Sequence, residues 1–139
     1  MRILAVDYGD ARTGLALCDP GGSLASPLAV IEEKSERELV KKIAALASQN
    51  GARLIVVGYP RNMDGSGGPR AQKCEAFAKS LESFSKIKTA LWDERLTTKS
   101  ALAAMNVTGT RGKKRKAAVD SAAACIILQD YLDHLKNIG

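Results

Sequence analysis

The chain has 139 residues, of which 45% are hydrophobic and 26% charged, with a net charge of +6. This length suits one domain with a buried core, so we expect residues 1–139 to form a single domain without disulfides. No apolar stretch approaches the ~18 residues of a membrane span and no signal peptide is recognisable, which predicts a cytoplasmic protein without a membrane partner. The three cysteines are widely spaced and His134 is the single histidine, which argues against a zinc site and a histidine-based triad. Any metal is therefore expected to have oxygen ligands.

Three strands are predicted before any helix. A continuous apolar run at residues 3–6 is typical of a buried central strand, and a turn at residues 9–13 returns the chain as a hairpin. Gly9 and Gly14 are interpreted as hairpin glycines with positive φ. The turn signal "DPGG" then separates the second strand, at residues 14–18, from the third, at residues 27–31.

Helices and strands alternate after the third strand, which describes an α/β domain with a mixed sheet. "SERE" predicts a helix start with Ser35 as N-cap and Glu38 completing a capping box, and Gly51 closes that helix. The strand that follows, at residues 53–58, is expected to run parallel to the first. The remaining expected elements are a loop over 59–70, a helix whose buried face carries Cys74, Phe77, Ala78 and Leu81, a strand over 87–92, a short helix over 101–105, a mobile basic loop over 106–116 and a long helix over 117–135.

Carboxylates fall where the predicted parallel strands end, which is where α/β sheets bind their ligands. Asp7 ends the first strand, and Asp93 and Glu94 end the last. Asp120 lies on the final helix and is expected to point toward the sheet. Its face, at steps of three and four, continues through Ala123, Ala124, Ile127 and Tyr131.

Each carboxylate also has a purely structural interpretation. Asp7 can cap its own backbone in the turn at Gly9, and the two interpretations of Asp7 weigh equally. Glu94 can be part of a surface charge cluster at a strand end. Asp120 can be a first-turn acid favoured by the helix dipole, but a lone charge facing a sheet is costly unless it is compensated, so we favour a functional role.

Convergence of Asp7, Glu94 and Asp120 would place three negative charges close together, where they repel. Divalent cations remove that conflict, and ligation by oxygen alone suits Mg²⁺ or Mn²⁺. A pair of such ions can activate water and stabilise the leaving oxygen in phosphodiester cleavage. The sequence therefore predicts a metal-dependent nuclease site.

A basic run immediately precedes the helix of Asp120 and consists of Arg111, Lys113, Lys114, Arg115 and Lys116. Near a cation site these charges can hold phosphates, whereas in isolation they would be a solvated loop. Arg61, in the polar loop after the fourth strand, offers a further contact or is plain surface. The chain has only six aromatic residues, which argues against a broad base-stacking platform and favours recognition of backbone and shape.

Four motifs in this order, "VDYGDARTGLAL", "VVGYPRNMDGS", "DERLTT" and "VDSAAACIILQDYL", resemble the YqgF/RuvX family through nearly the whole chain. The resemblance implies an RNase H-like fold, with a five-stranded mixed sheet in the order 3-2-1-4-5 flanked by helices and related to RuvC-type resolvases. It implies a metal-dependent nuclease that processes the 5′ end of precursor 16S ribosomal RNA. Its acidic site falls on Asp7, Glu94 and Asp120, and Arg12, Arg95 and Lys116 match basic positions that contact phosphate.

Other functions stay open at this point. A Holliday junction resolvase acting on branched DNA is one alternative, and a non-catalytic nucleic-acid-binding module on the same fold is another. Sugar-kinase and actin-like ATPases also start with a strand, an aspartate and a glycine hairpin, but they need two such domains. Pre-rRNA versus branched DNA, Mg²⁺ versus Mn²⁺, and monomer versus homodimer are likewise open.

Overall fold

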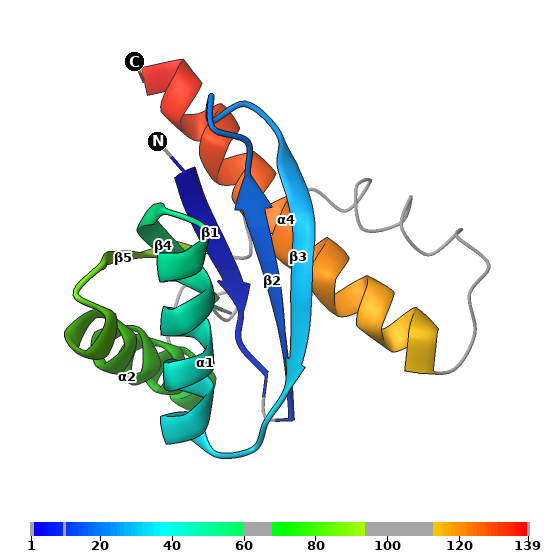
Figure 1. Cartoon of the computed structure of the whole chain (residues 1–139), viewed down its shortest axis with the longest axis vertical. Helices are drawn as coiled ribbons and strands as arrows, with labels where there is room; N and C mark the ends of the chain where they lie inside the picture. Colours follow the sequence, from blue (N-terminus) through cyan, green and yellow to red (C-terminus); the bar gives the residue numbers. More distant parts are fainter. Residues whose placement is uncertain (1, 10, 60–67, 94–112, 139) are drawn as a thin grey trace.

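A computed structural model of the chain describes residues 2–9, 11–59, 68–93 and 113–138 (Figure 1). At residues 59, 68–70, 113–121 and 137–138 it describes the backbone alone. The elements in chain order are β1 (Arg2–Asp7), β2 (Arg12–Cys18), β3 (Ala25–Glu32), α1 (Glu36–Gln49), β4 (Ala52–Tyr59), α2 (Gly68–Ser85), β5 (Lys88–Asp93) and α4 (Lys113–Ile138). None of the described helices is both long and apolar enough to cross a bilayer.

The five strands form one mixed sheet in the order β3-β2-β1-β4-β5, which confirms the predicted strand order. β1 pairs antiparallel with β2 and parallel with β4, and β4 pairs parallel with β5. The helix between β3 and β4 returns the chain in its original direction, as a crossover of this length does. The carboxyl ends of β1, β4 and β5 therefore lie at the same edge of the sheet.

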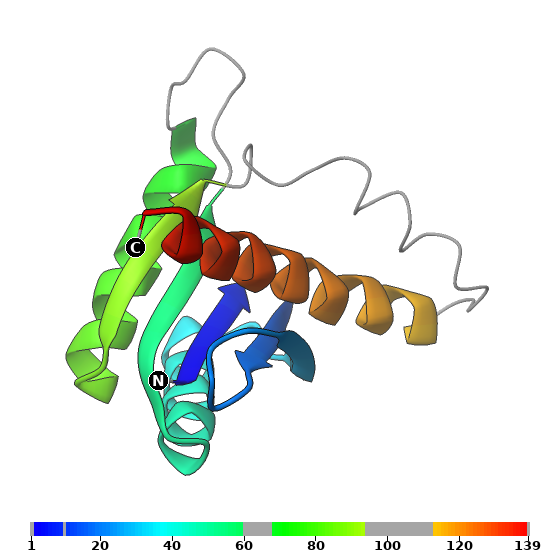
Figure 2. The ribbon, with the colours of Figure 1, turned by 90° about the horizontal axis from the view of Figure 1, so that it is seen from above.

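Helices cover both faces of the sheet, with α1 and α2 on one face and α4 on the other (Figure 2). Side chains of β1 alternate between these layers, so that Leu4 and Val6 join the α1–α2 core while Ile3 and Ala5 join the α4 core. Burial of each large aliphatic side chain contributes roughly 1.5–3 kcal/mol, which fixes the register of the central strand. The first half of α4 extends past the β3 edge of the sheet (Figures 1 and 2).

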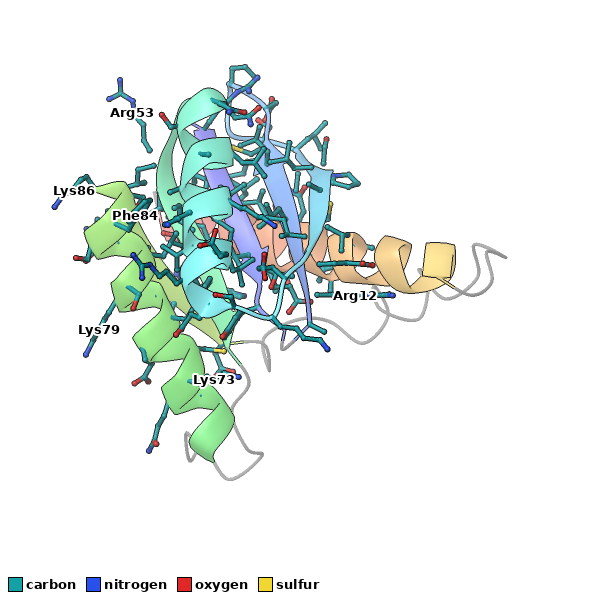
Figure 3. The ribbon with its side chains drawn as sticks, turned by 60° about the horizontal axis from the view of Figure 1, so that its bottom comes forward. Arg12, Arg53, Lys73, Lys79, Phe84 and Lys86 are labelled. Carbon is teal, nitrogen blue, oxygen red and sulfur yellow. The ribbon has the colours of Figure 1, made fainter. Side chains whose placement is uncertain are left out.

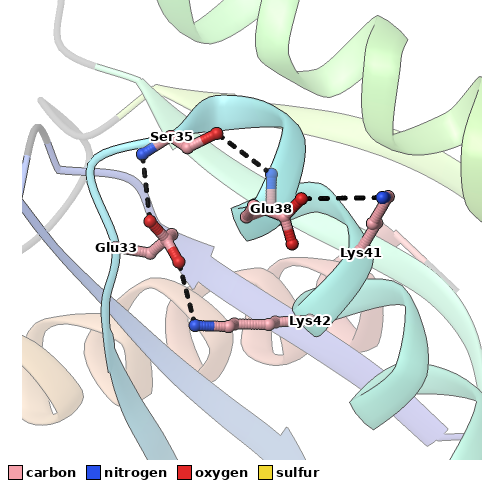
Figure 4. A network of polar contacts seen from close by, with 5 residues as sticks. All are labelled: Glu33, Ser35, Glu38, Lys41 and Lys42. Carbon is pink, nitrogen blue, oxygen red and sulfur yellow. Dashed lines mark hydrogen bonds and ion pairs between the residues drawn. The ribbon is translucent and has the colours of Figure 1, made fainter.

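The start of α1 differs from the predicted capping box (Figure 4). Ser35 is the N-cap, and its Oγ accepts a hydrogen bond from the Glu38 amide at 3.4 Å, as expected. The reciprocal bond comes from a different residue, because the Ser35 amide donates to Glu33 Oε2 at 3.2 Å. Lys42 Nζ donates a second hydrogen bond, to Glu33 Oε1 at 2.9 Å. The bond from Lys42 and, to a smaller extent, the bond from the Ser35 amide lower the pKa of Glu33. Glu38 instead pairs with Lys41 at 3.5 Å.

Two helices begin earlier than the sequence predicts. α2 starts at Gly68, so that Pro69 lies in its first turn, where the missing proline N–H needs no intrahelical partner. α4 starts at Lys113 rather than Ala117, so that four of the five basic residues assigned to a loop lie on a helix. Gly51 has a φ of 68°, which confirms it as the residue that ends α1.

Candidate active site

Asp7 is the last residue of β1 and faces the α4 layer. It shares a face of the strand with Ile3 and Ala5, which pack in the α4 core, whereas the next residue, Tyr8, packs in the opposite core. Its register partners are Gly14 on β2 and Gly58 on β4. Both neighbours are glycines, so neither paired strand presents a side chain beside the carboxylate on this face of the sheet.

The turn after Asp7 is held from both sides. The Tyr8 ring stacks on Phe77 of α2, with centroids 4.1 Å apart and planes within 3°, and Lys73 Nζ lies 5.7 Å from the Tyr8 ring centroid. Thr13 is fully buried, and its Oγ1 accepts a hydrogen bond from the Gly9 amide at 3.4 Å. These contacts fix the backbone on which Asp7 is carried.

The expected positive φ at Gly9 and Gly14 is wrong, because among the described glycines only Gly22 and Gly51 adopt it. Gly9 is needed for another reason: a Cβ at this position would overlap the Arg12 carbonyl oxygen. Gly14 lies within β2 opposite Asp7. Both glycines therefore make room, one for the turn and one for the carboxylate.

Arg12 begins β2 at the same end of the sheet (Figure 3). Its Nε lies 3.5 Å from Glu32 Oε1, while its Nη1 is buried and has no hydrogen-bond partner in the described part of the chain. A groove of about 450 Å³ opens here, lined by Ala11, Arg12, Glu32, Glu33 and Lys34. Arg12 thus has donor capacity that Glu32 does not use, which suits a phosphate oxygen.

The side chains of β5 divide between the two faces as alternation predicts. Ala90 and Trp92 pack in the α4 core, and Thr89 Oγ1 donates to the Ala78 carbonyl of α2 at 3.4 Å. Asp93 shares the Thr89 side and therefore faces away from the α4 layer that Asp7 faces. Glu94 lies outside the described residues.

Asp120 lies eight residues into α4, counting from its first residue, Lys113. The helix dipole acts within about the first turn, so the earlier start of α4 removes the first-turn explanation for this acid. Ala124 and Ile127, which continue its face, are 0% and 2% exposed, and Tyr131 packs against the same core. The backbone thus places Asp120 one turn before a face that is buried against the sheet.

Several predicted site residues lie outside the side chains that the structure describes. Among the described residues, no three histidine, cysteine, aspartate or glutamate side chains group together. The side chains of Asp120, Lys113, Lys114, Arg115 and Lys116 are not described. The residues Arg61, Glu94, Arg95 and Arg111 and the expected helix at 101–105 lie outside the described ranges.

Cysteine and histidine chemistry is not supported in this part of the chain. Cys18 and Cys74 are buried, and burial raises the pKa of the Cys125 thiol to about 11, so that it stays protonated at neutral pH. His134 packs against Trp92, with ring centroids 5.3 Å apart. Oxygen donors remain, and they suit Mg²⁺ or Mn²⁺.

Sequence reasoning missed the residues that shape the surroundings of Asp7. The sequence indicates a turn residue at Gly14 and a strand residue at Gly58. Their position on either side of Asp7 depends on strand register. Tyr8, Phe77 and Thr13 hold the turn, but apolar spacing alone indicated only that Phe77 is buried. Strand register identifies the two glycines, and contacts in the folded chain identify Tyr8, Phe77 and Thr13. A single sequence contains neither signal.

Comparison with known proteins places the chain among nucleases and resolvases. A family model described as "RuvX: Holliday junction resolvase" matches residues 1–134. Relatives named "Putative pre-16S rRNA nuclease" from Ruminiclostridium cellulolyticum and Acetivibrio thermocellus are 42% and 43% identical, over 97% and 96% of this chain and 96% of each relative.

Solved structures show the fold. RuvC from T. thermophilus in complex with Holliday junction substrate has a TM-score of 0.63 at 10% identity, covering 96% of both chains. The Fowlpox virus resolvase with Holliday junction DNA has a TM-score of 0.59 at 13% identity, covering 97% of this chain and 99% of that one. The expected RNase H-like fold is therefore confirmed.

Proposed function

The chain belongs to the RuvX family, and on this premise we propose that residues 1–139 form one nuclease domain that cleaves structured nucleic acid with a divalent metal. The proposed substrate is the 5′ end of precursor 16S ribosomal RNA in the cytoplasm. Relatives that carry this name are 42% and 43% identical to the chain over nearly its full length. Cleavage of branched DNA is the competing activity, because the matching family is described as a Holliday junction resolvase.

The position of Asp7 carries this proposal. A carboxylate at the carboxyl end of the central strand lies where α/β folds bind ligands. Asp7 faces the layer of α4, the helix that bears Asp120. Its register partners on the neighbouring strands, Gly14 and Gly58, have no side chains. A plain turn aspartate would need neither the glycine neighbours nor the facing helix.

We assign Asp7, Glu94 and Asp120 as the residues that would hold the metal. When bound, Mg²⁺ or Mn²⁺ supplies Lewis-acid activation of water and stabilisation of the leaving oxygen. Asp7 is held rigidly for this role because Tyr8 is stacked on Phe77 and Thr13 bonds the Gly9 amide. The sheet alternation that turns Asp93 to the other face supports Glu94 as the third ligand.

Basic side chains would hold the nucleic-acid backbone around the carboxylates. Arg12 lies at the same sheet edge with an unused buried donor, so we assign it to a phosphate near the cleaved bond. We assign the same kind of contact to Arg61, Arg95, Arg111, Lys113, Lys114, Arg115 and Lys116. Such contacts position the substrate and carry no base information.

A cleavage assay tests this function directly. The substrates are an RNA containing the 5′ leader of 16S rRNA, an unstructured single-stranded RNA and a four-way DNA junction, each with Mg²⁺ or Mn²⁺. We expect wild-type protein to cut the leader RNA, and chelation by EDTA to abolish cutting. Preferential cutting of the junction would assign the resolvase activity instead, and binding of all substrates without cutting would indicate a non-catalytic module.

A further inference from the structure

A second surface, on the opposite face of the sheet from Asp7, combines an exposed aromatic ring with cations. Phe84, near the end of α2, is 55% exposed, whereas Phe77 on the same helix is fully buried. A groove of about 360 Å³ runs between α1 and α2 beside this ring. We call it the Phe84 groove, and its lining residues are Glu36, Arg37, Val40, Lys41, Ser80 and Phe84.

Two cations, Arg37 and Lys41, line the Phe84 groove together with Glu36, and further cations lie on the same flank of the molecule. Arg37, Lys79, Lys86 and Arg53 are exposed and form no ion pair with any described residue. Lys79, Lys86 and Arg53 lie with Phe84 on one flank of the molecule (Figure 3). Lys41 is the exception, because it pairs with Glu38 at 3.5 Å. The excess of positive charge suits an anionic chain more than a neutral or acidic surface.

Lys86 occupies a backbone position that normally favours glycine. Its φ is 62°, and it is the one residue other than glycine with positive φ in the described part of the chain. Its amide bonds the Glu82 carbonyl at 2.9 Å and ends α2. Glycine ends helices in this conformation without the steric cost that a Cβ brings. A lysine at this position retains a cation beside Phe84 at a cost in stability, which points to a use for the charge.

A path connects the groove with the candidate active site. Lys73, which lies over Tyr8 next to Asp7, is on the same helix as Phe84. Eleven residues of α2 separate Lys73 from Phe84 in sequence, which is roughly 16 Å along a helix. A few nucleotides that leave the site around the carboxyl edge of the sheet therefore reach the groove along α2.

From this arrangement we propose that the Phe84 groove binds a single-stranded segment of nucleic acid adjacent to the cleaved bond. One unpaired base stacks on the Phe84 ring, and Arg37, Lys79 and Lys86 hold the flanking phosphates. A single ring is enough for one base, which agrees with the small number of aromatic residues in the chain. The inference rests on the proposed function and adds to it a requirement for an unpaired flank in the substrate.

Binding without divalent metal tests the groove separately from cleavage. The probes are a fluorescein-labelled ten-nucleotide oligouridine and a fully paired, blunt-ended RNA duplex. Base–aromatic stacking predicts that Phe84→Ala weakens oligouridine binding about 5- to 150-fold and leaves duplex binding unchanged. Leu91→Ala is the matched control, because Leu91 is an apolar residue of β5 that is 39% exposed. It should bind both probes as the wild type does.

Lys86→Gly separates loss of charge from loss of fold. Glycine relieves the positive φ, so the melting temperature should stay equal or rise. Oligouridine binding should nevertheless weaken, and the slope of log affinity against log salt should become shallower by about 0.7 for the lost phosphate contact.

Equal oligouridine affinities for wild type and Phe84→Ala would overturn the inference and leave the proposed nuclease intact. An equal loss for oligouridine and the blunt-ended duplex would also overturn it, because stacking requires an unpaired base. Unchanged affinities for both RNAs are also the result expected if the ring docks a protein. Wild-type protein that binds neither probe and cuts no substrate would overturn the proposed function as well.

Discussion

At the scale of single residues, adjacent acids at the end of β5 are predicted to have different roles. Asp93 shares the sheet face of Thr89, which bonds α2, whereas Ala90 and Trp92 face α4. We expect Glu94→Gln to lose cleavage while it still binds substrate, and Asp93→Asn to lose mainly stability. Single-turnover cleavage rates and melting temperatures of both variants show which acid is needed for cleavage and which for stability. A well-folded, inactive Asp93→Asn beside an active Glu94→Gln would reverse the assignment.

Asp130 on α4 is predicted to destabilise the protein when it is ionised. Its Oδ2 is buried without a partner in the described part of the chain, and burial, followed by the nearby charge of Asp133, raises the pKa of Asp130 above 3.8. The folded state therefore binds the proton more tightly than the unfolded state, and stability falls as pH rises from 3.8 through the raised folded value. Asp130→Asn should melt at a higher temperature than wild type at pH 7.

The control for Asp130 is how the difference in melting temperature between Asp130→Asn and wild type depends on pH. The gain in melting temperature should shrink as pH falls through the raised value and vanish below 3.8, where both states of wild type are protonated. Asp133→Asn should give a smaller gain, because it removes only the secondary cause, while the Oδ1 of asparagine can still accept the 3.2 Å hydrogen bond from Gln129 Nε2. A gain that is equal at pH 3 and pH 7 would contradict this account.

At the scale of elements, the basic start of α4 is predicted to supply affinity with little sequence preference. Three of its basic residues lie in the first turn of the helix, namely Lys113, Lys114 and Arg115. Each cation there destabilises the helix by about 0.3–1 kcal/mol, because the N-terminal end of the helix dipole is positive. A bound phosphate would compensate this unfavourable charge. Replacing all three by serine should weaken binding similarly for all sequences. It should also flatten the salt slope by about 0.7–0.9 per lost phosphate contact. An unchanged slope would show that these residues are only solvated.

The sequence was sufficient to predict most elements but not how they face one another. Continuous apolar runs predicted the buried central strands β1 and β4, and turn signals helped to place the hairpin strands β2 and β3. The predicted start of α4 is wrong, because a cluster of lysines and arginines after a glycine is typical of a loop. The structure shows that the helix includes four of these residues. The glycines beside Asp7 are there because of the register that brings Gly14 and Gly58 to either side of it. Register is set by packing over the whole sheet, which one sequence does not reveal.

At the scale of the whole molecule, the proposed convergence of Asp7, Glu94 and Asp120 would oblige the fold to tolerate their repulsion until a cation binds. Asp7 is anchored through the Tyr8–Phe77 stack to α2 and through β1 to the centre of the sheet. Neutralising one of the repelling charges relieves part of this cost. Asp7→Asn and Asp120→Asn should therefore fold normally and melt, without metal, at temperatures equal to or above that of wild type. Clear destabilisation of both would indicate structural roles.

Single-turnover cleavage of the 16S leader RNA by wild type and Asp7→Asn, with Mg²⁺ or Mn²⁺, tests the central claim most directly. The substitution preserves size and removes a metal-binding charge, which is worth several kcal/mol in such sites, so the rate should fall at least about 100-fold. RNA binding and the folded state should be retained. Cleavage by Asp7→Asn at the wild-type rate would contradict the placement of the active site at the carboxyl end of β1.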